Sequence, residues 1–117
     1  MRDLRMYILV NQDIVIGKGK LAGQVGHAVA VMFYSGWKGS NEPFPAIVEY
    51  MNVQKKIILY TPQSKLEELE AKGFITIRDN GLTDLEPNTL TCVNLGLVDY
   101  DEIPEDFAFI KDLKLVR

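Results

Sequence analysis

The sequence predicts an α/β domain in three layers (α/β/α), with helices on both faces of a four-stranded, mixed and mostly parallel sheet. Short apolar segments typical of buried strands alternate along the chain with longer segments typical of helices. Connections of the strand–helix–strand kind favour parallel crossovers. The 117 residues are the usual size of one domain, so we expect a single domain over residues 1–117.

Four segments are rich in β-branched or aromatic side chains and are expected to be strands: residues 6–10, 56–60, 74–78 and 89–97. Four others are expected to be helices: residues 20–34, about 44–52, 64–72 and a short segment opened by Pro104. Ser64 and Glu67 have the spacing of a capping box, and Gly73 would end the helix that they begin.

The composition is that of a globular protein, with 47% hydrophobic and 25% charged residues. No apolar run is long enough to span a membrane, and the first residues do not resemble a signal peptide, so we expect a cytoplasmic protein without a membrane partner. The single cysteine, Cys92, cannot form an internal disulfide or a zinc cluster. The net charge of −3 argues against nucleic-acid binding over the whole surface, so any anion site is local.

The segment GKGKLAGQVGHA, residues 17–28, contains the only histidine of the chain. On a helix, Lys20, Gln24 and His27 form one polar stripe, while the other side chains are small or apolar, so both flanks are expected to be covered. A lysine at a helix start favours phosphate, an imidazole can move a proton, and a glutamine can orient water or a carbonyl group. The alternative is that the stripe simply faces water.

A second group of polar residues, in DNGLTDLEPNTLT, follows the third expected strand. Ligand sites in sheets with parallel strands lie at the carboxyl ends, so Asp79 and the lysine segment are expected to meet in one crevice. The alternative is a turn, because Asp-Asn-Gly is a strong turn former and threonines are common in strands. Trp37, in an expected loop, could stack on a base or anchor local packing.

These motifs resemble the second family of peptidyl-tRNA hydrolases, the type found in archaea and eukaryotes. The resemblance covers YILV-x-x-D leading into GKGK-x-A-x-Q-x-x-H-A, then D-x-G-x-T-x-L-x-P-x-T-x-T, and the terminal LKLV. It implies a four-stranded sheet, a common dimeric state, and hydrolysis without a cofactor or metal of the ester that links a peptide to the 3′ ribose of tRNA. The family's functional residues map onto Lys18, Lys20, Gln24, His27, Asp79, Thr83 and Thr91.

The sequence departs from the family at two positions beside Asp79. Family members usually show D-A-G-R-T-Q, whereas Leu82 and Asp84 stand here in place of the arginine and the glutamine. The middle region is also shorter and the chain is acidic. Each change is expected to weaken contact with the tRNA backbone, because phosphate affinity comes largely from Lys and Arg.

The sequence therefore predicts a hydrolase of peptidyl-tRNA or of a related aminoacyl or peptidyl ester, with a homodimer as a possible assembly. His27, Asp79 and Lys20 are the expected catalytic residues, with His27 or Asp79 as the base or the group that orients water. Lys18, Gln24, Thr83 and Thr91 are expected to bind the substrate. The alternatives are a non-catalytic binding module of the same fold and a small-nucleotide binder that uses GKGK, although neither a Walker A nor a Rossmann motif is present.

Overall fold

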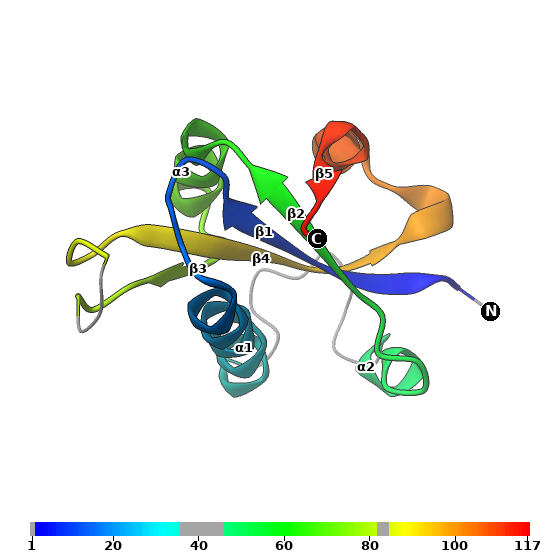
Figure 1. Cartoon of the computed structure of the whole chain (residues 1–117). Coiled ribbons are helices and arrows are strands. Elements are labelled where there is room, and N and C mark those ends of the chain that lie inside the picture. The colour runs from blue at the N-terminus through cyan, green and yellow to red at the C-terminus, as the bar shows by residue number, and fades with distance from the viewer. Residues whose placement is uncertain (1, 36–45, 82–84) are drawn as a thin grey trace.

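One mixed sheet forms the centre of the computed structural model, which describes residues 2–35, 46–81 and 85–117. Within these residues the sheet has five strands in the order β3-β4-β1-β2-β5 (Figure 1). Their bounds are β1 Leu4–Asn11, β2 Lys56–Thr61, β3 Ile75–Arg78, β4 Leu90–Asp99 and β5 Lys114–Leu115. The predicted α/β class with a mixed sheet is confirmed.

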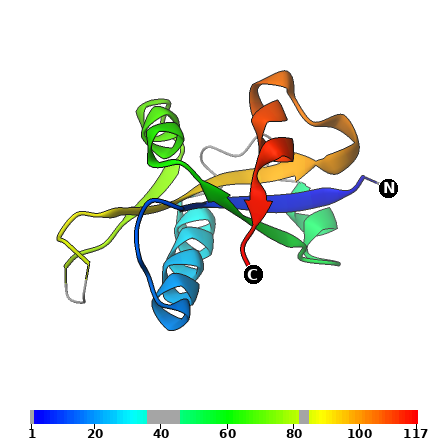
Figure 2. The ribbon, with the colours of Figure 1, turned by 45° about the horizontal axis from the view of Figure 1, so that its top comes forward.

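The predicted strand number and direction are wrong in two respects. A fifth strand, β5, pairs with β2 through Leu59 and Leu115 (Figure 2). Among the described strands only β1 and β2 are parallel neighbours, because β4 lies antiparallel between β1 and β3, and β5 is antiparallel to β2. The connection from β3 to β4 contains no helix in its described part and is too short for a parallel crossover, so β4 returns beside β3 in the opposite direction.

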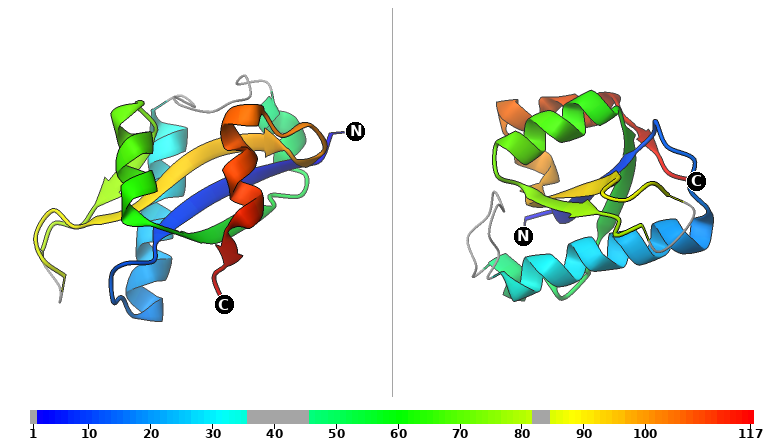
Figure 3. Two further views of the ribbon diagram at one scale, coloured as in Figure 1. Left: turned by 90° about the horizontal axis from the view of Figure 1, so that it is seen from above. Right: turned by 90° about the vertical axis from the view of Figure 1, so that its left-hand side faces the viewer.

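Helices lie on both faces of the sheet (Figures 1 and 3). Helices α1 (Lys18–Tyr34) and α2 (Ala46–Tyr50) cover one face, while α3 (Gln63–Ala71) and the 3-10 segments η1 (Tyr100–Glu102) and η2 (Glu105–Asp112) lie on the other. Side chains of β1 alternate between the two apolar cores: Met6, Ile8 and Val10 face α1, and Tyr7 and Leu9 face α3. No helix in the described residues is long and apolar enough to cross a membrane.

Helix α3 begins differently from the prediction. The capping box of Ser64 and Glu67 does not form, because Pro62 is the N-cap and no side chain within the helix caps it. Instead the backbone N–H of Gln63 donates to the carboxylate of Asp13 at 2.8 Å. A carboxylate is favoured at a helix N-terminus, so the loop after β1 supplies the cap from 50 residues away in the chain.

Among the described residues helix α1 is covered on one side only, so the expectation of two covered flanks is wrong for this part of the chain. Gln24, Ala28 and Met32 are its buried residues, whereas Gly23 and Gly26 are exposed. A Cβ atom placed on either glycine meets no neighbouring atom within 4 Å. These glycines therefore do not serve close packing within the described part of the chain.

Tyr50, on α2, is expected to be replaceable by phenylalanine with a gain in stability. Its side chain is 1% exposed, and within the described residues its hydroxyl is the buried side-chain polar atom that has no hydrogen-bond partner. Burial also raises the pKa of this phenol to about 12. Removing an unsatisfied hydroxyl should raise the free energy of unfolding of Tyr50→Phe by about 1 kcal/mol in urea titrations. Tyr34→Phe is the control, and it should change the free energy of unfolding little because Tyr34 is 92% exposed. A destabilised Tyr50→Phe variant would contradict this interpretation.

Candidate active site

The candidate site lies where α1 begins, beside the end of β3 and the start of β4. Lys20 lies in the first turn of α1, and its Nζ is 2.5 Å from Oδ1 of Asp79, the residue that follows β3. The Lys20 side chain is 25% exposed and that of Asp79 is 4% exposed. The expected meeting of the lysine segment with Asp79 is thus present, and it places an ion pair at the edge of the core.

The backbone around Asp79 is held by hydrogen bonds on both sides. Its N–H donates to the carbonyl oxygen of Thr89 at 2.8 Å, and its carbonyl oxygen accepts from the N–H of Asn88 at 2.7 Å. Its Oδ2 accepts from the N–H of Gly81 at 2.9 Å. Gly81 has φ of +78°, and a Cβ there would lie 2.8 Å from Pro87, so this turn requires glycine. The expected Asp-Asn-Gly turn therefore exists and fixes the carboxylate that faces Lys20.

Gln24 lies one turn further along α1 than Lys20, and Thr91 contacts it from β4. The Thr91 hydroxyl is 2.8 Å from Oε1 of Gln24 and 2.9 Å from the carbonyl oxygen of Ile77. Because a hydroxyl has one proton, it donates to one of these oxygens at a time. The amide nitrogen of Gln24 has no hydrogen-bond partner among the described residues. It is also not among their buried unpaired atoms, so it is accessible to solvent. This N–H donor is therefore available beside Lys20.

A β-bulge explains why Thr91 faces α1. Cys92 pairs with Ile77 and Leu90 pairs with Arg78, so Thr91 is the additional residue of β4. A bulge redirects a side chain, and here both Thr91 and Cys92 approach Gln24, with the Cys92 Sγ 3.5 Å from its carbonyl oxygen. Burial raises the pKa of the Cys92 thiol to about 12, so the thiol is protonated at neutral pH and is a poor nucleophile.

His27 is not brought into contact with the Lys20–Asp79 pair. It is exposed, and within the described part of the chain it has no hydrogen bond or ion pair. Seven residues separate it from Lys20, a rise of about 10 Å along the helix axis. Lys18 is also exposed and lies on the other flank of α1. Thr83, with Leu82, Asp84 and Trp37, lies outside the described residues.

The start of α1 concentrates positive charge. Lys18 and Lys20 occupy its first turn, which contains no acidic residue, and the unpaired N–H groups of a helix start add to the positive potential. Asp79 is the carboxylate that the structure pairs with Lys20. Within the described ranges there is no group of three or more His, Cys, Asp or Glu side chains that could hold a metal ion.

The sequence analysis did not identify Asn11, which organises the loop between β1 and α1. Asn11 is 2% exposed. Its Nδ2 donates to the carbonyl oxygen of Leu90 at 2.9 Å and to Oε1 of Gln63 at 3.1 Å, and its Oδ1 accepts from the N–H of Asp13 at 2.8 Å. An asparagine directly after the expected strand 6–10, two residues before an aspartate, was the available signal for such a turn.

Comparison with known proteins identifies the family. The family model of peptidyl-tRNA hydrolase PTH2 matches residues 4–116. The chain belongs to this family. A peptidyl-tRNA hydrolase of Saccharolobus islandicus is 36% identical over 105 residues, which cover 80% of this chain and 85% of that protein. A peptidyl-tRNA hydrolase of Thermoplasma volcanium is 32% identical over 113 residues, covering 90% of this chain and 93% of its own.

A third relative, a peptidyl-tRNA hydrolase of Staphylothermus marinus, is 36% identical over 104 residues, covering 80% of this chain and 82% of its own. The PTH2 match begins at the first residue of β1 and extends beyond β5, so it includes both segments that form the ion pair. The resemblance inferred from the motifs is thereby confirmed.

Proposed function

We propose that the chain hydrolyses peptidyl-tRNA at the ester between the peptide and the 3′ ribose. Membership of the PTH2 family over residues 4–116 and the printed names of the archaeal relatives support this reaction. The observation that supports the site is the ion pair of Lys20 with the buried carboxylate of Asp79, near the Gln24 amide, whose nitrogen has no hydrogen-bond partner among the described residues.

In this proposal Asp79 is the group that receives the proton of the attacking water. The water oxygen forms a bond to the ester carbonyl carbon, and the tetrahedral intermediate collapses with release of the ribose oxygen, which takes up the proton held by Asp79 and leaves as a hydroxyl group. The carboxylic acid product then loses its proton to solvent. The peptide is released as a carboxylate. Asp79 is held by the Gly81 N–H and by Lys20, so it is preorganised for this role.

Lys20 and Gln24 are the proposed donors to the oxygen that becomes negative in the transition state. Preorganised donors are among the largest contributions to catalysis of acyl transfer. Thr91 is a positioning residue, because its hydroxyl lies 2.8 Å from the Gln24 amide oxygen and so orients the amide. No cofactor or metal has a role in this scheme.

Lys18, His27 and Thr83 are the proposed contacts with the rest of the substrate. His27→Ala is expected to lower kcat/KM about ten-fold, mainly through a higher KM, because its exposed imidazole does not contact the Lys20–Asp79 pair. Steady-state hydrolysis of N-acetylated aminoacyl-tRNA, measured over a range of substrate concentrations, separates the two constants. A fall in kcat above 100-fold with KM unchanged would instead assign His27 to the chemical step.

The decisive experiment is release of N-acetylated amino acid from charged tRNA by the purified chain. Hydrolysis above the buffer rate supports the proposal. Binding of the charged tRNA without release would indicate a non-catalytic module. Binding of free nucleotides without release would indicate a nucleotide site at GKGK, and either result would overturn the proposed activity.

We also infer a three-layer single domain over residues 1–117, a cytoplasmic location and a homodimer. Helices on both faces of one sheet support the layer arrangement. The exposed side of α1 supports the dimer, because Phe33 is 42% exposed on the same side of the helix as Gly26, where an added Cβ meets no neighbouring atom. Light scattering after size-exclusion chromatography tests the assembly: a mass of twice 13.2 kDa is expected.

A further inference from the structure

We propose that the chain has a second binding site, apart from the Lys20–Asp79 pair, which takes a small carboxylate with an apolar body. The site is a cavity of about 470 Å³ on the face of the sheet that η1 and η2 cover. Cavities of roughly 300–1,000 Å³ are the usual size of small-molecule sites. The inference goes beyond the proposed hydrolysis and does not depend on it.

The cavity lies between the sheet and the segment that leads from β4 to β5. This segment contains η1 and η2, and it crosses over β1 and β2, because these two strands separate β4 from β5 (Figures 2 and 3). Ile57 and Leu59 of β2 line one wall, and Ile103 and Ile110 line the opposite wall. Covering such walls with an apolar group is favourable by about 25 cal/mol for each Å² removed from water.

The cavity is separate from the candidate active site. Tyr7, in the middle of β1, lines the cavity and packs in the core on the side of α3. Lys20 lies on α1, which covers the other face, and the Asp79 carboxylate contacts Lys20 there. The sheet therefore stands between a ligand in the cavity and the reacting groups.

Tyr7 presents a hydrogen-bond donor to the cavity. Tyr7 is 4% exposed, yet its hydroxyl is not among the buried unpaired atoms of the described residues, so the hydroxyl is open to the cavity. Burial raises the pKa of this phenol, and the charge of the nearby Arg5 guanidinium opposes part of the rise. The phenol therefore keeps its proton at neutral pH, and this proton has no acceptor among the described residues.

Arg5 is held beside Tyr7 as a preorganised cation. Its Nε and Nη2 donate to the two carboxylate oxygens of Asp3 at 3.2 and 2.8 Å, and its guanidinium carbon lies 3.8 Å from the ring centroid of Tyr100. Lys55 donates to the same carboxylate at 2.9 Å, so one positive charge is left over in this cluster. The N–H groups of the Arg5 Nη1 are not bonded to Asp3. A donor fixed in this way loses little freedom when it binds a ligand.

The charged groups that line the cavity are cations, so the ligand is expected to be an anion. Lys111 of η2 is the second cation, on the wall opposite Arg5. Among the described residues no carboxylate lines the cavity, and the acidic residues of η1 and η2 are exposed. Hydrogen bonds from such donors to a carboxylate are roughly twice as strong as neutral ones. A purely apolar molecule would leave the Tyr7 hydroxyl unsatisfied, and inorganic phosphate would leave the apolar walls uncovered.

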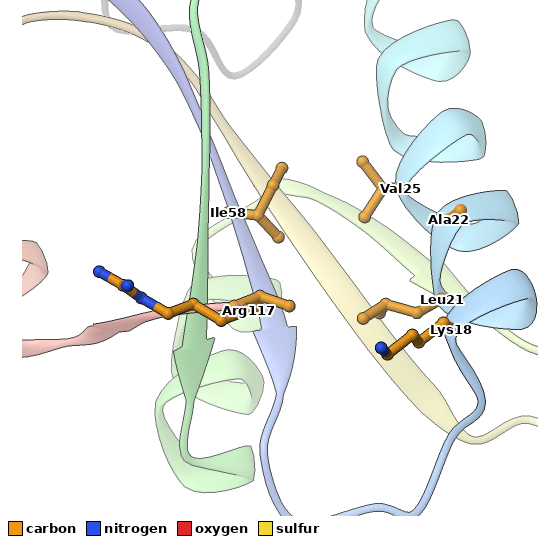
Figure 4. A pocket seen from close by; sticks show the side chains of 7 residues that line it. Lys18, Leu21, Ala22, Val25, Ile58 and Arg117 are labelled. Carbon is orange, nitrogen blue, oxygen red and sulfur yellow. The ribbon is translucent and has the colours of Figure 1, made fainter.

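A cavity on the α1 face lacks these features and provides an internal control. It has a volume of about 310 Å³ and lies between α1 and β2, where Leu21 and Val25 point toward Ile58 (Figure 4). Lys18 and Arg117, the cations that line it, are both exposed, and the Arg117 guanidinium is turned away from α1. The described residues give this cavity apolar walls but no buried donor for a carboxylate.

The test is a titration of the methyl-labelled chain with 4-methylpentanoate, followed by NMR. A Kd of about 1 mM is expected for a ligand of this size. The neutral isostere 4-methylpentanamide lacks the charge and acetate lacks the apolar body, so each should bind about ten-fold more weakly. Methyl resonances of Ile57, Leu59 and Ile110 should shift, whereas those of Val25 and Ile58 should not.

Conservative variants test the two donors. Tyr7→Phe removes the hydroxyl but keeps the ring, and it should weaken binding of 4-methylpentanoate about ten-fold. Tyr60→Phe is its matched control, because Tyr60 lies on the neighbouring strand and faces α1, and it should leave the Kd within about two-fold. Lys111→Met should weaken binding about three-fold, whereas Lys72→Met, at an exposed lysine outside the cavity, should not. Thermal unfolding of each variant checks that the fold is intact.

Three results would each overturn the proposal: equal affinity for the carboxylate and the amide, equal affinity of Tyr7→Phe and Tyr60→Phe for 4-methylpentanoate, or shifts confined to Val25 and Ile58. Titration with N-acetyl-leucine distinguishes two sources of the ligand. Comparable affinity would include the carboxylate end of a peptide, and much weaker binding would restrict the site to free acids. All these measurements are of binding, so they stand whether or not the chain hydrolyses peptidyl-tRNA.

Discussion

Replacing Asp79 with asparagine is expected to lower kcat for peptidyl-tRNA hydrolysis by about 100-fold or more while the fold is retained. Asparagine has the same shape and can still accept from the Gly81 N–H, but it cannot take a proton from water or pair with Lys20. A positioned general base contributes roughly 10² to 10⁴ in rate. The measurement is steady-state release of N-acetylated amino acid, with a thermal unfolding curve for each variant.

Glu70→Gln provides a matched control. Glu70 forms an ion pair at 2.7 Å with Arg78, the residue that precedes Asp79 in the chain. The hydrogen bond from the Arg78 guanidinium holds the pKa of the Glu70 carboxyl below its usual value. The substitution removes a carboxylate and an ion pair beside the same turn, so it should leave kcat within about two-fold. An equal fall of kcat in Asp79→Asn and Glu70→Gln would show that the activity depends on the structure of this turn and not on the carboxylate of Asp79.

Lys20→Met in the same assay tests whether the pair acts as a unit. The single variant loses the proposed donor to the oxyanion and leaves a carboxylate that is 4% exposed without its ion-pair partner. Groups that act together show strongly non-additive effects on rate, so the double variant with Asp79→Asn should be little slower than either single variant. Full additivity would place Lys20 and Asp79 in separate steps.

Much of the fold follows from local patterns in the sequence. The run MYILV predicted the central strand because both faces of β1 are buried. The length and composition of residues 20–34 predicted α1, which begins two residues earlier than expected. The missed strand, β5, has only two residues, which is too short a segment for an alternating strand pattern to be recognised. Its formation depends on the unpaired edge of β2.

The site could be predicted only in part, because tertiary contacts decide the rest. The rule that ligands bind at the carboxyl ends of strands brought Asp79 to the lysine segment, as the structure has it. The bulge at Thr91 depends on the register of β4 against β3, which no local pattern shows. Helical spacing placed His27 with Lys20 and Gln24, but spacing cannot show that Gln24 is 5% exposed while His27 faces solvent.

Asn94→Ala is expected to lower the free energy of unfolding by about 2–4 kcal/mol, the largest loss of stability that we predict. Asn94 is fully buried in β4 and connects the sheet to α1. Its Nδ2 donates to the carbonyl oxygen of Ala28 at 3.2 Å, and its Oδ1 accepts from the N–H of Gly96 at 2.7 Å. Alanine leaves the Gly96 N–H unsatisfied and creates a cavity, and each effect costs about 1–3 kcal/mol.

Urea unfolding followed by circular dichroism measures the change, with Asn52→Ala as the control at an exposed asparagine. Asn94→Asp separates hydrogen bonding from packing, because it keeps the shape and the acceptor for Gly96 but cannot donate to Ala28 while ionised. Burial opposes ionisation, so the pKa of this aspartate should be higher in the folded than in the unfolded chain. Relative to the wild type, Asn94→Asp should therefore lose less stability at pH 4 than at pH 7. A loss that does not depend on pH would show that this aspartate ionises as readily in the folded as in the unfolded chain, which would contradict the interpretation of position 94 as a site that excludes charge.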